Sequence, residues 1–237
     1  MNGLIGIAGV VGILLAAGAV IAAIQRGGVR WPWLLAAAGL VVLNDAMLTN
    51  LYGRLPDLIG GGWNWQGKAL ALVATLLVAA LPAVGWRASG LTPRLSTERL
   101  GVALLGTVAY LGFFLAIALA FPGEPADAET IAFQLTMPGF EEEPFYRGLL
   151  LLVLGQAFVG RWRFLGADWH WGAVLSCMLF GLAHAFGYSD GAFGFDAVTM
   201  ALTALPSFIA VWLVLLTRSV LLPVVLHNFG NAVTLLI

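Results

Sequence analysis

The chain has 237 residues, of which 61% are hydrophobic and only 10% are charged, and its formal net charge is −1. A water-soluble globular domain is closer to half apolar and a quarter charged, so one water-facing core cannot bury this much apolar surface. The small net charge and the lack of a basic stripe argue against a nucleic-acid partner. The composition therefore predicts an integral membrane protein whose partner is the lipid bilayer.

Eight apolar segments follow one another along the chain. A helix needs about 20 mostly apolar residues to cross a bilayer, and helices are expected because an open sheet edge in lipid leaves backbone groups unpaired. The segments are residues 3–24, 32–50, 69–86, 100–121, 130–159, 171–187, 197–217 and 219–237. We predict an all-α, polytopic bundle of about eight transmembrane helices, with residues 1–237 in one integral membrane domain.

Basic residues are distributed unevenly between the connecting segments. The odd-numbered loops hold eight arginines, whereas the even-numbered loops hold only Arg54 and Lys68. Positively charged loops stay in the cytoplasm, so both termini are expected outside. The turn-rich segments "PGEPADAE" and "GYSDGAFGFD" are predicted to be loops. The arginine-rich, lysine-poor chain is typical of bacteria, and the expected location is the bacterial cytoplasmic membrane, with several passes.

The fifth segment carries a run of charge, "EEEPFYR", at residues 141–147. Charged residues inside a span usually face a protein interior or a water-filled cavity. Glu143 and Arg147 lie four residues apart with the acid first, the order that favours an ion pair on a helix. Alternatively, Pro138 and Gly139 break the chain, and the glutamates cap a new helix that begins near Glu142 in interfacial water. These residues alone leave both interpretations open.

Two later segments carry histidines. In "FGLAH", Phe180 and His184 lie one turn apart, and in "HNFGN", His227 and Asn231 lie at i and i+4 on one helix face. A lone histidine on an apolar helix is usually a packing residue, and Asn228 is interpreted as a hydrogen-bonding group between helices. A charged run, a histidine and a His/Asn pair on three separate spans are harder to explain by packing when taken together.

The chemistry open to these residue types is hydrolysis. Glutamate and histidine together can activate water, and a second histidine with an asparagine can stabilise an oxyanion. The same glutamate and two histidines can instead hold zinc with an open water position. The chain has no H-E-x-x-H helix and no G-x-S-x-G elbow, which argues against those protease types. Water activation by glutamate and zinc chemistry therefore both stay open on the residues alone.

The three polar stretches match three motifs in chain order. "EEPFYR" fits E-E-x-x-x-R, "FGLAH" fits F-x-x-x-H and "HNFGN" fits H-x-x-x-N/D. Together they resemble the CPBP family, the CAAX proteases and bacteriocin-processing enzymes also called the Abi group, and within it the type II CAAX prenyl endopeptidases. The resemblance covers the motif-bearing half, about residues 130–237, and the first four spans carry no matching signature.

The resemblance implies an intramembrane endopeptidase that hydrolyses a peptide bond of a membrane-associated protein or peptide. By position, Glu142 and His184 are implied to activate the water, and His227 and Asn231 are implied to bind the oxyanion. The residues implied to shape the site and balance its charge are Glu143, Arg147 and Phe180. Glu141 and Asp45 receive no role.

The same resemblance bears on the cofactor, the substrate and an alternative function. Because Asn231 is a poor zinc ligand, a glutamate-type site without metal or other cofactor is favoured slightly over a zinc protease. The zinc ligands in the other case are Glu142, His184 and His227. In a bacterium, a peptide precursor or a membrane protein is a more natural substrate than a prenylated CAAX protein. The alternative function is a non-catalytic scaffold or bacteriocin-immunity protein that binds a peptide in the same cavity.

Overall fold

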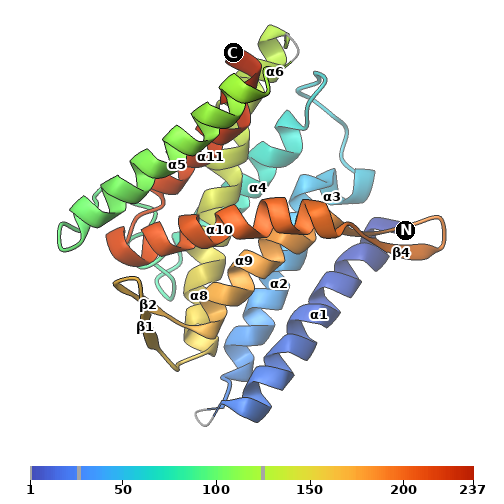
Figure 1. Cartoon of the computed structure of the whole chain (residues 1–237). Coiled ribbons are helices and arrows are strands. Elements are labelled where there is room, and N and C mark those ends of the chain that lie inside the picture. The colour runs from blue at the N-terminus through green and yellow to red at the C-terminus, as the bar shows by residue number, and fades with distance from the viewer. Residues whose placement is uncertain (1, 26–27, 124–125) are drawn as a thin grey trace.

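A computed structural model describes residues 2–25, 28–123 and 126–237 of the chain (Figure 1). Arg26, one of the arginines used to predict the orientation, lies outside the described residues, as does Glu124 of the expected loop "PGEPADAE". The regular elements of the described residues are helices apart from two short β-hairpins. The prediction of an all-α polytopic membrane fold is confirmed.

All eight predicted segments contain helices. In chain order these are α1 (Asn2–Ile24), α2 (Trp31–Leu48), α3 (Asn50–Gly53), α4 (Trp65–Ala79), α5 (Leu100–Ala120), α6 (Ala128–Gln134), α7 (Met137–Glu142), the π-helix η1 (Glu143–Leu150), α8 (Leu151–Ala157), α9 (Trp171–Ala185), α10 (Ala197–Thr217) and α11 (Leu221–Leu236). Within the described ranges, the helices long and apolar enough to cross a membrane are the four α1, α2, α5 and α10. The apolar helices α4, α9 and α11 are shorter.

Two predicted segments extend beyond their helices. The segment 69–86 was expected to be one span, but α4 ends at Ala79 and residues 80–84 form turns. Pro82 explains this end, because the residue before a proline is disfavoured in the helical conformation. The segment 171–187 also ends early, since α9 stops at Ala185 and a strand begins at Phe186.

The segment "GYSDGAFGFD" is a β-hairpin rather than a loop. Its strands β3 (Phe186–Ser189) and β4 (Ala192–Phe195) pair in antiparallel register. The turn residues Asp190 and Gly191 both have positive φ, 51° and 81°, which matches the tight hairpin turn that an Asp-Gly pair favours. A second hairpin, β1 (Trp162–Phe164) with β2 (Ala167–Trp169), lies between α8 and α9.

Helices α7, η1 and α8 form one uninterrupted helix over residues 137–157. Pro144 lies inside it and has no backbone N–H to donate to the preceding turn, which explains why the helix widens to π geometry there. The helix begins at Met137, so the three glutamates lie inside it and not at its start. The interpretation that they cap a new helix near Glu142 is therefore wrong.

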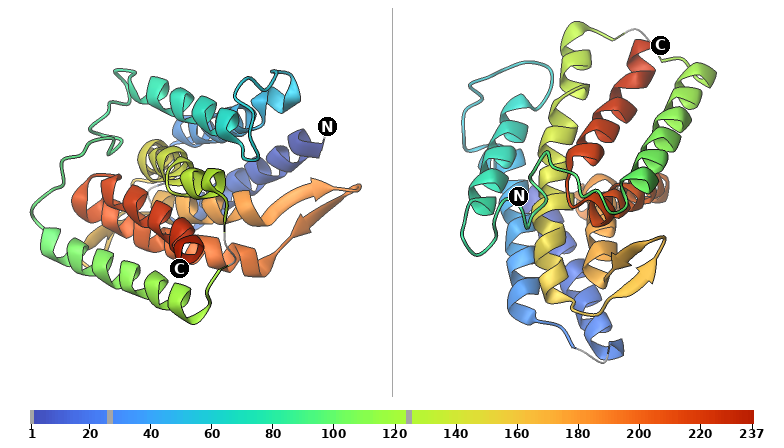
Figure 2. Two further views of the ribbon diagram at one scale, coloured as in Figure 1. Left: turned by 90° about the horizontal axis from the view of Figure 1, so that it is seen from above. Right: turned by 90° about the vertical axis from the view of Figure 1, so that its left-hand side faces the viewer.

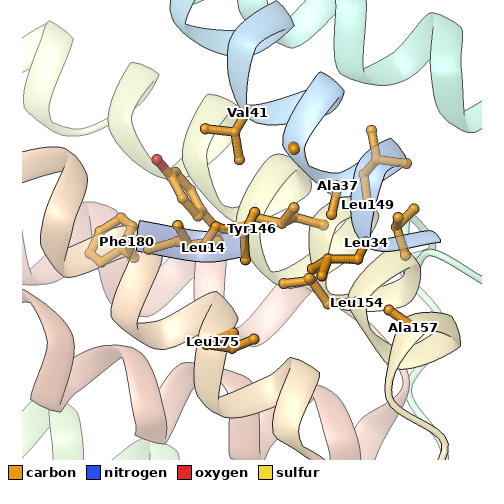
Figure 3. Packing of buried hydrophobic residues seen from close by; sticks show 14 of the residues in the cluster. Leu14, Leu34, Ala37, Val41, Tyr146, Leu149, Leu154, Ala157, Leu175 and Phe180 are labelled. Atoms are coloured by element: carbon orange, nitrogen blue, oxygen red, sulfur yellow. The ribbon is translucent and has the colours of Figure 1, made fainter. Parts of the chain in front are cut away.

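This central helix is surrounded on several sides. Seen from above, it lies between α4 on one side and α10 and α11 on the other (Figure 2, left), and it contacts α2 and α9 as well. One hydrophobic cluster joins η1 and α8 to α1, α2 and α9, with side chains such as Leu14, Leu34 and Leu149 meeting in its interior (Figure 3). A second cluster joins α5, α9, α10 and α11. The charged residues of the central helix are thus held between two apolar clusters.

The start of α10 is tied to the end of α9. The backbone N–H of Asp196 donates to the carbonyl oxygen of Ala185 at 2.8 Å, one residue after His184. The Asp196 carboxylate accepts hydrogen bonds from the backbone N–H groups of Val198 and Thr199. The Thr199 hydroxyl and these two amides lower the pKa of the Asp196 carboxyl. This cap fixes the last turn of α9, which carries His184.

Candidate active site

One cavity of about 540 Å³ collects every residue that the sequence placed in or around the site. Its walls come from α4, α5, α6, α9, α10, α11 and the central helix. The predicted residues that line it are Glu142, Glu143, Arg147, Phe180, His184, His227 and Asn231. The i and i+4 spacing within each motif puts both ends of that motif on one helix face, and three such faces meet here.

Glu142 presents its two carboxylate oxygens to different partners. Oε1 forms an ion pair with the Lys68 ammonium. Oε2 is buried and has no hydrogen-bond partner among the described residues. The nearest ring nitrogens are Nε2 of His227 at 3.6 Å and Nε2 of His184 at 4.0 Å. One oxygen is therefore held by a cation, and the other faces two histidines across the cavity.

The hydrogen bonds of the two histidines define which ring nitrogen carries the proton. Nδ1 of His184 lies 2.8 Å from the carbonyl oxygen of Phe180, and Nδ1 of His227 lies 2.6 Å from Oε1 of Glu143. A carbonyl and a carboxylate only accept hydrogen bonds, so both Nδ1 atoms must donate. In the neutral rings, each Nε2 is then an unprotonated acceptor. Three acceptors, with Oε2 of Glu142 as the third, thus converge on one point.

Glu143 and Arg147 form the ion pair that their spacing predicted. Oε2 of Glu143 lies 3.2 Å from Nε of Arg147, and the two side chains are only 1% and 3% exposed. The Arg147 guanidinium also lies over the Phe180 ring, 3.8 Å from its centre. The same ring packs against the imidazole rings of His184 and His227. Phe180 therefore packs between Arg147 and the two imidazole rings and supports both rings, while His227 reaches Glu143 directly.

The two asparagines of α11 have different partners. Nδ2 of Asn231 donates to Oε1 of Gln134 at 3.1 Å, so one of its amide hydrogens is engaged at the edge of the cavity. Oδ1 of Asn228 accepts from the backbone N–H of Gly139 at 2.7 Å and joins α11 to α7. The prediction that Asn228 bonds between helices is confirmed. A Cβ at position 139 would lie 2.8 Å from the Val224 carbonyl oxygen, so this close approach of the helices requires glycine.

Sequence reasoning missed two charged residues beside the site. Nζ of Lys68, in the first turn of α4, lies 2.7 Å from Oε2 of Glu141 and also contacts Glu142. Lys68 is 73 positions from Glu141, and in the sequence it served only as a basic residue of an even-numbered loop. The available signal was that Lys68 is the only lysine in the chain. Asp45, which had no predicted role, lines a separate cavity of about 320 Å³ between α1, α2 and α9.

The proposed zinc ligands are spaced more widely than one zinc ion requires. Two atoms bound to one zinc ion at about 2.0–2.1 Å in a tetrahedral arrangement are roughly 3.4 Å apart. Oε2 of Glu142 is 3.6 Å from Nε2 of His227 and 4.0 Å from Nε2 of His184, both wider than that. Among the described residues, no group of three His, Cys, Asp or Glu side chains has the geometry to hold a metal ion.

Comparison with known proteins gives one match. Residues 126–233 match the family model described as type II CAAX prenyl endopeptidase Rce1-like, a segment that contains all three motifs. Neither a curated protein nor a solved structure matches the chain significantly. The family match supports a membrane protease of the CAAX type in general. The match of residues 126–233 to the type II CAAX prenyl endopeptidase Rce1-like model confirms the resemblance to the CPBP family that the three motifs carry.

Proposed function

We propose that the protein is an intramembrane endopeptidase in which Glu142 and His184 activate a water molecule to attack a peptide bond. The observation that carries this proposal is the convergence of Oε2 of Glu142 with Nε2 of His184 and Nε2 of His227 at 3.6–4.0 Å, without a donor between them in the described structure. The buried Oε2 of Glu142 requires a donor, and a water molecule supplies two hydrogens, one for this oxygen and one for a histidine Nε2. The oxygen lone pair of this water molecule then points into the cavity.

The reaction proceeds by direct attack of this water on the substrate. As the water oxygen bonds to the carbonyl carbon, Glu142 takes one of its protons, and the carbonyl oxygen becomes an oxyanion. When the carbon–nitrogen bond breaks, that proton passes to the leaving nitrogen. The second water proton stays on the new carboxyl group, so the immediate products are a carboxylic acid that contains the water oxygen and a free amine. The acid then gives this proton to the amine or to solvent, and Glu142 has returned to its starting state.

The oxyanion is stabilised by His227 and Asn231. Because Nδ1 of His227 donates to Glu143, the ring can donate from Nε2 only when it carries both protons. Nε2 becomes a donor when the ring takes up a second proton during the reaction, and the Glu143 carboxylate at Nδ1 lies where it can stabilise the imidazolium that then forms. Asn231 adds the amide hydrogen that Gln134 does not engage. Donors aimed at a developing oxyanion are typically worth about 10²–10³ in kcat each.

The site works without a metal in this proposal. Lys68 already supplies a positive charge beside Glu142, and Asn231 is a poor ligand for zinc. We expect cleavage by the purified protein to persist after dialysis against a strong chelator. Stoichiometric zinc in the purified protein, together with loss of cleavage on chelation and its return on addition of zinc, would contradict this part of the proposal.

The proposed substrate is a peptide precursor or a membrane protein of the bacterial cytoplasmic membrane. Large apolar side chains are exposed along α1 and α5, as expected for surfaces that face lipid. A segment to be cleaved must reach a cavity that lies among these helices. A substrate that already resides in the bilayer or at its surface meets this requirement most directly.

New peptide N termini test the proposal without knowledge of the substrate. Purified protein is incubated with membranes from cells that lack it, and the N termini that appear are identified by mass spectrometry. Wild type and Glu98→Gln, an isosteric change of an exposed acid, should create the same new termini, whereas Glu142→Gln should create none. If wild type creates none, or Glu142→Gln creates the same set, the protein is not this protease, and a peptide-binding scaffold is favoured instead.

A further inference from the structure

The first turn of α4, which carries Lys68, is held in place by contacts that do not involve Lys68. Oδ1 of Asn64 accepts a hydrogen bond from the N–H of Gly67 at 3.0 Å and thereby caps the helix. Nδ2 of Asn64 donates to the carbonyl oxygen of Leu48 at 2.9 Å, which ties this cap to the end of α2. Lys68 therefore extends from a rigid first turn, and the position of its ammonium group is defined by two helices.

The Lys68 ammonium joins two consecutive residues of the central helix. It lies 2.7 Å from Oε2 of Glu141 and in ion-pair contact with Oε1 of Glu142. An ammonium is a compact charge with three donors, whereas a guanidinium is a wide planar fork. The ten other basic residues of the chain are all arginines. A lysine is the residue that fits between two carboxylates so close together.

The side chains of Glu141, Lys68 and Glu142 differ in how far they lie from the cavity. Glu141 is completely buried and does not line the cavity, whereas Lys68 and Glu142 both do. A structural ion pair needs only one acid, and here a second acid holds the lysine from the side away from the cavity. The contact of Lys68 takes up Oε1 of Glu142 and leaves Oε2 toward the two histidines.

We infer that Lys68, anchored by Glu141, is a positioning residue that fixes the Glu142 carboxylate in the orientation required to activate water. The inference rests on the proposed function, because it explains how the base of that reaction is held. Neither Lys68 nor Glu141 exchanges a proton with the substrate. Without the clamp, the carboxylate can rotate about its last side-chain bond, so that Oε2 no longer faces both histidines.

Lys68→Met tests the clamp by removing the charge while keeping the length of the side chain. A misplacement of about 1 Å in an active site can cost about 100-fold in rate. We expect kcat for the peptide that wild type cleaves fastest in membranes to fall about 100-fold or more. The KM should change by no more than about 3-fold, because the defect lies in the base and not in substrate binding. The single variant should also melt at a lower temperature, because Glu141 is left buried without its cation.

The double variant Lys68→Met/Glu141→Leu separates positioning from stability. Replacing both partners of a buried ion pair by apolar residues is often neutral for stability, so the melting temperature should return toward that of wild type. We expect kcat to stay about 100-fold low, since Glu142 still lacks its clamp. Recovery of both melting temperature and kcat in the double variant would overturn the inference and leave Lys68 a purely structural role.

Glu142→Gln, measured in the same experiment, distinguishes failure of the clamp from failure of the proposed function. If Glu142→Gln is inactive and Lys68→Met cleaves like wild type, the positioning role is wrong and the protease proposal stands. If Glu142→Gln cleaves like wild type, the proposed function itself fails. Glu98→Gln serves as the control for the general effect of losing one exposed acid.

Discussion

Helix α5 and the π-helix η1 invert the usual relation between polarity and burial. α5 is almost entirely apolar, yet only Ala103, Thr107 and Ala118 of its 21 residues are buried. In η1, all eight residues are buried, including Glu143 and Arg147. A water-soluble protein would place these two helices the other way round. The difference shows that lipid is the solvent of the outer helices and that the charged helix is protected by protein.

The same comparison explains where the chemistry is placed. Charged groups inside a membrane are costly unless they pair or line a polar cavity. All three acids of the central helix are paired, Glu141 and Glu142 with Lys68 and Glu143 with Arg147. Glu142 and Glu143 also line the cavity. The apolar helices around them therefore serve to isolate a polar site.

The largest effect on stability is expected where a buried charge loses its partner. Arg147→Met leaves Glu143 buried without a cation and should lower the free energy of unfolding by about 3–5 kcal/mol. Chemical unfolding in detergent, followed by tryptophan fluorescence, measures the loss. Arg87→Met, on an exposed turn, is the matched control and should change stability by less than about 0.5 kcal/mol. Equal effects of the two variants would show that the central helix is not the protected region described here.

A smaller loss is expected at the hydrogen bond that joins α7 to α11. Asn228→Ala removes the acceptor of the buried Gly139 N–H and should destabilise the fold by about 1–3 kcal/mol. Chemical unfolding in detergent measures this loss. Unlike Arg147→Met, the Asn228→Ala substitution leaves no buried charge without a partner. A change below a few tenths of a kcal/mol would mean that the Gly139 N–H finds another acceptor and that the two helices are not held together here.

The smallest effect is expected on the lipid-facing side of α5. Leu105 is 72% exposed, so Leu105→Ala should alter the free energy of unfolding by less than about 0.5 kcal/mol in detergent. A loss of about 2–5 kcal/mol, the range for truncating a buried leucine, would show that this face is covered by another protein surface. Arg147→Met, Asn228→Ala and Leu105→Ala together test whether the loss of stability follows the burial of a side chain and not its hydrophobicity.

Much of the fold could be predicted because membrane helices are specified locally. The length and apolarity of a segment identify a span without knowledge of its neighbours, and each of the eight segments does contain a helix. The β3–β4 hairpin was missed although the Asp190–Gly191 pair is a recognised hairpin signal. The unbroken passage of the helix through Pro144 depends on packing from α4, α9 and α11, which no local pattern describes.

The site was predictable to the extent that its parts lie within single helices. The i and i+4 spacing brought Glu143 to Arg147, and the three motifs supplied every predicted residue that lines the cavity. The contact of Lys68 with Glu141 joins two helices distant in sequence, and it follows only from their packing. The bond of Asn231 to Gln134 is of the same kind.

The rate of cleavage by Glu142→Gln tests the central claim most directly. The change keeps the size of the side chain but removes its negative charge, and with it the capacity to take a proton from water and the ion pair with Lys68. On the peptide that wild type cleaves in membranes, we predict a single-turnover rate about 10³-fold below that of wild type, with the cleavage site unchanged and the protein folded. A rate within about 3-fold of wild type would contradict the claim that the buried acids of the central helix supply the base.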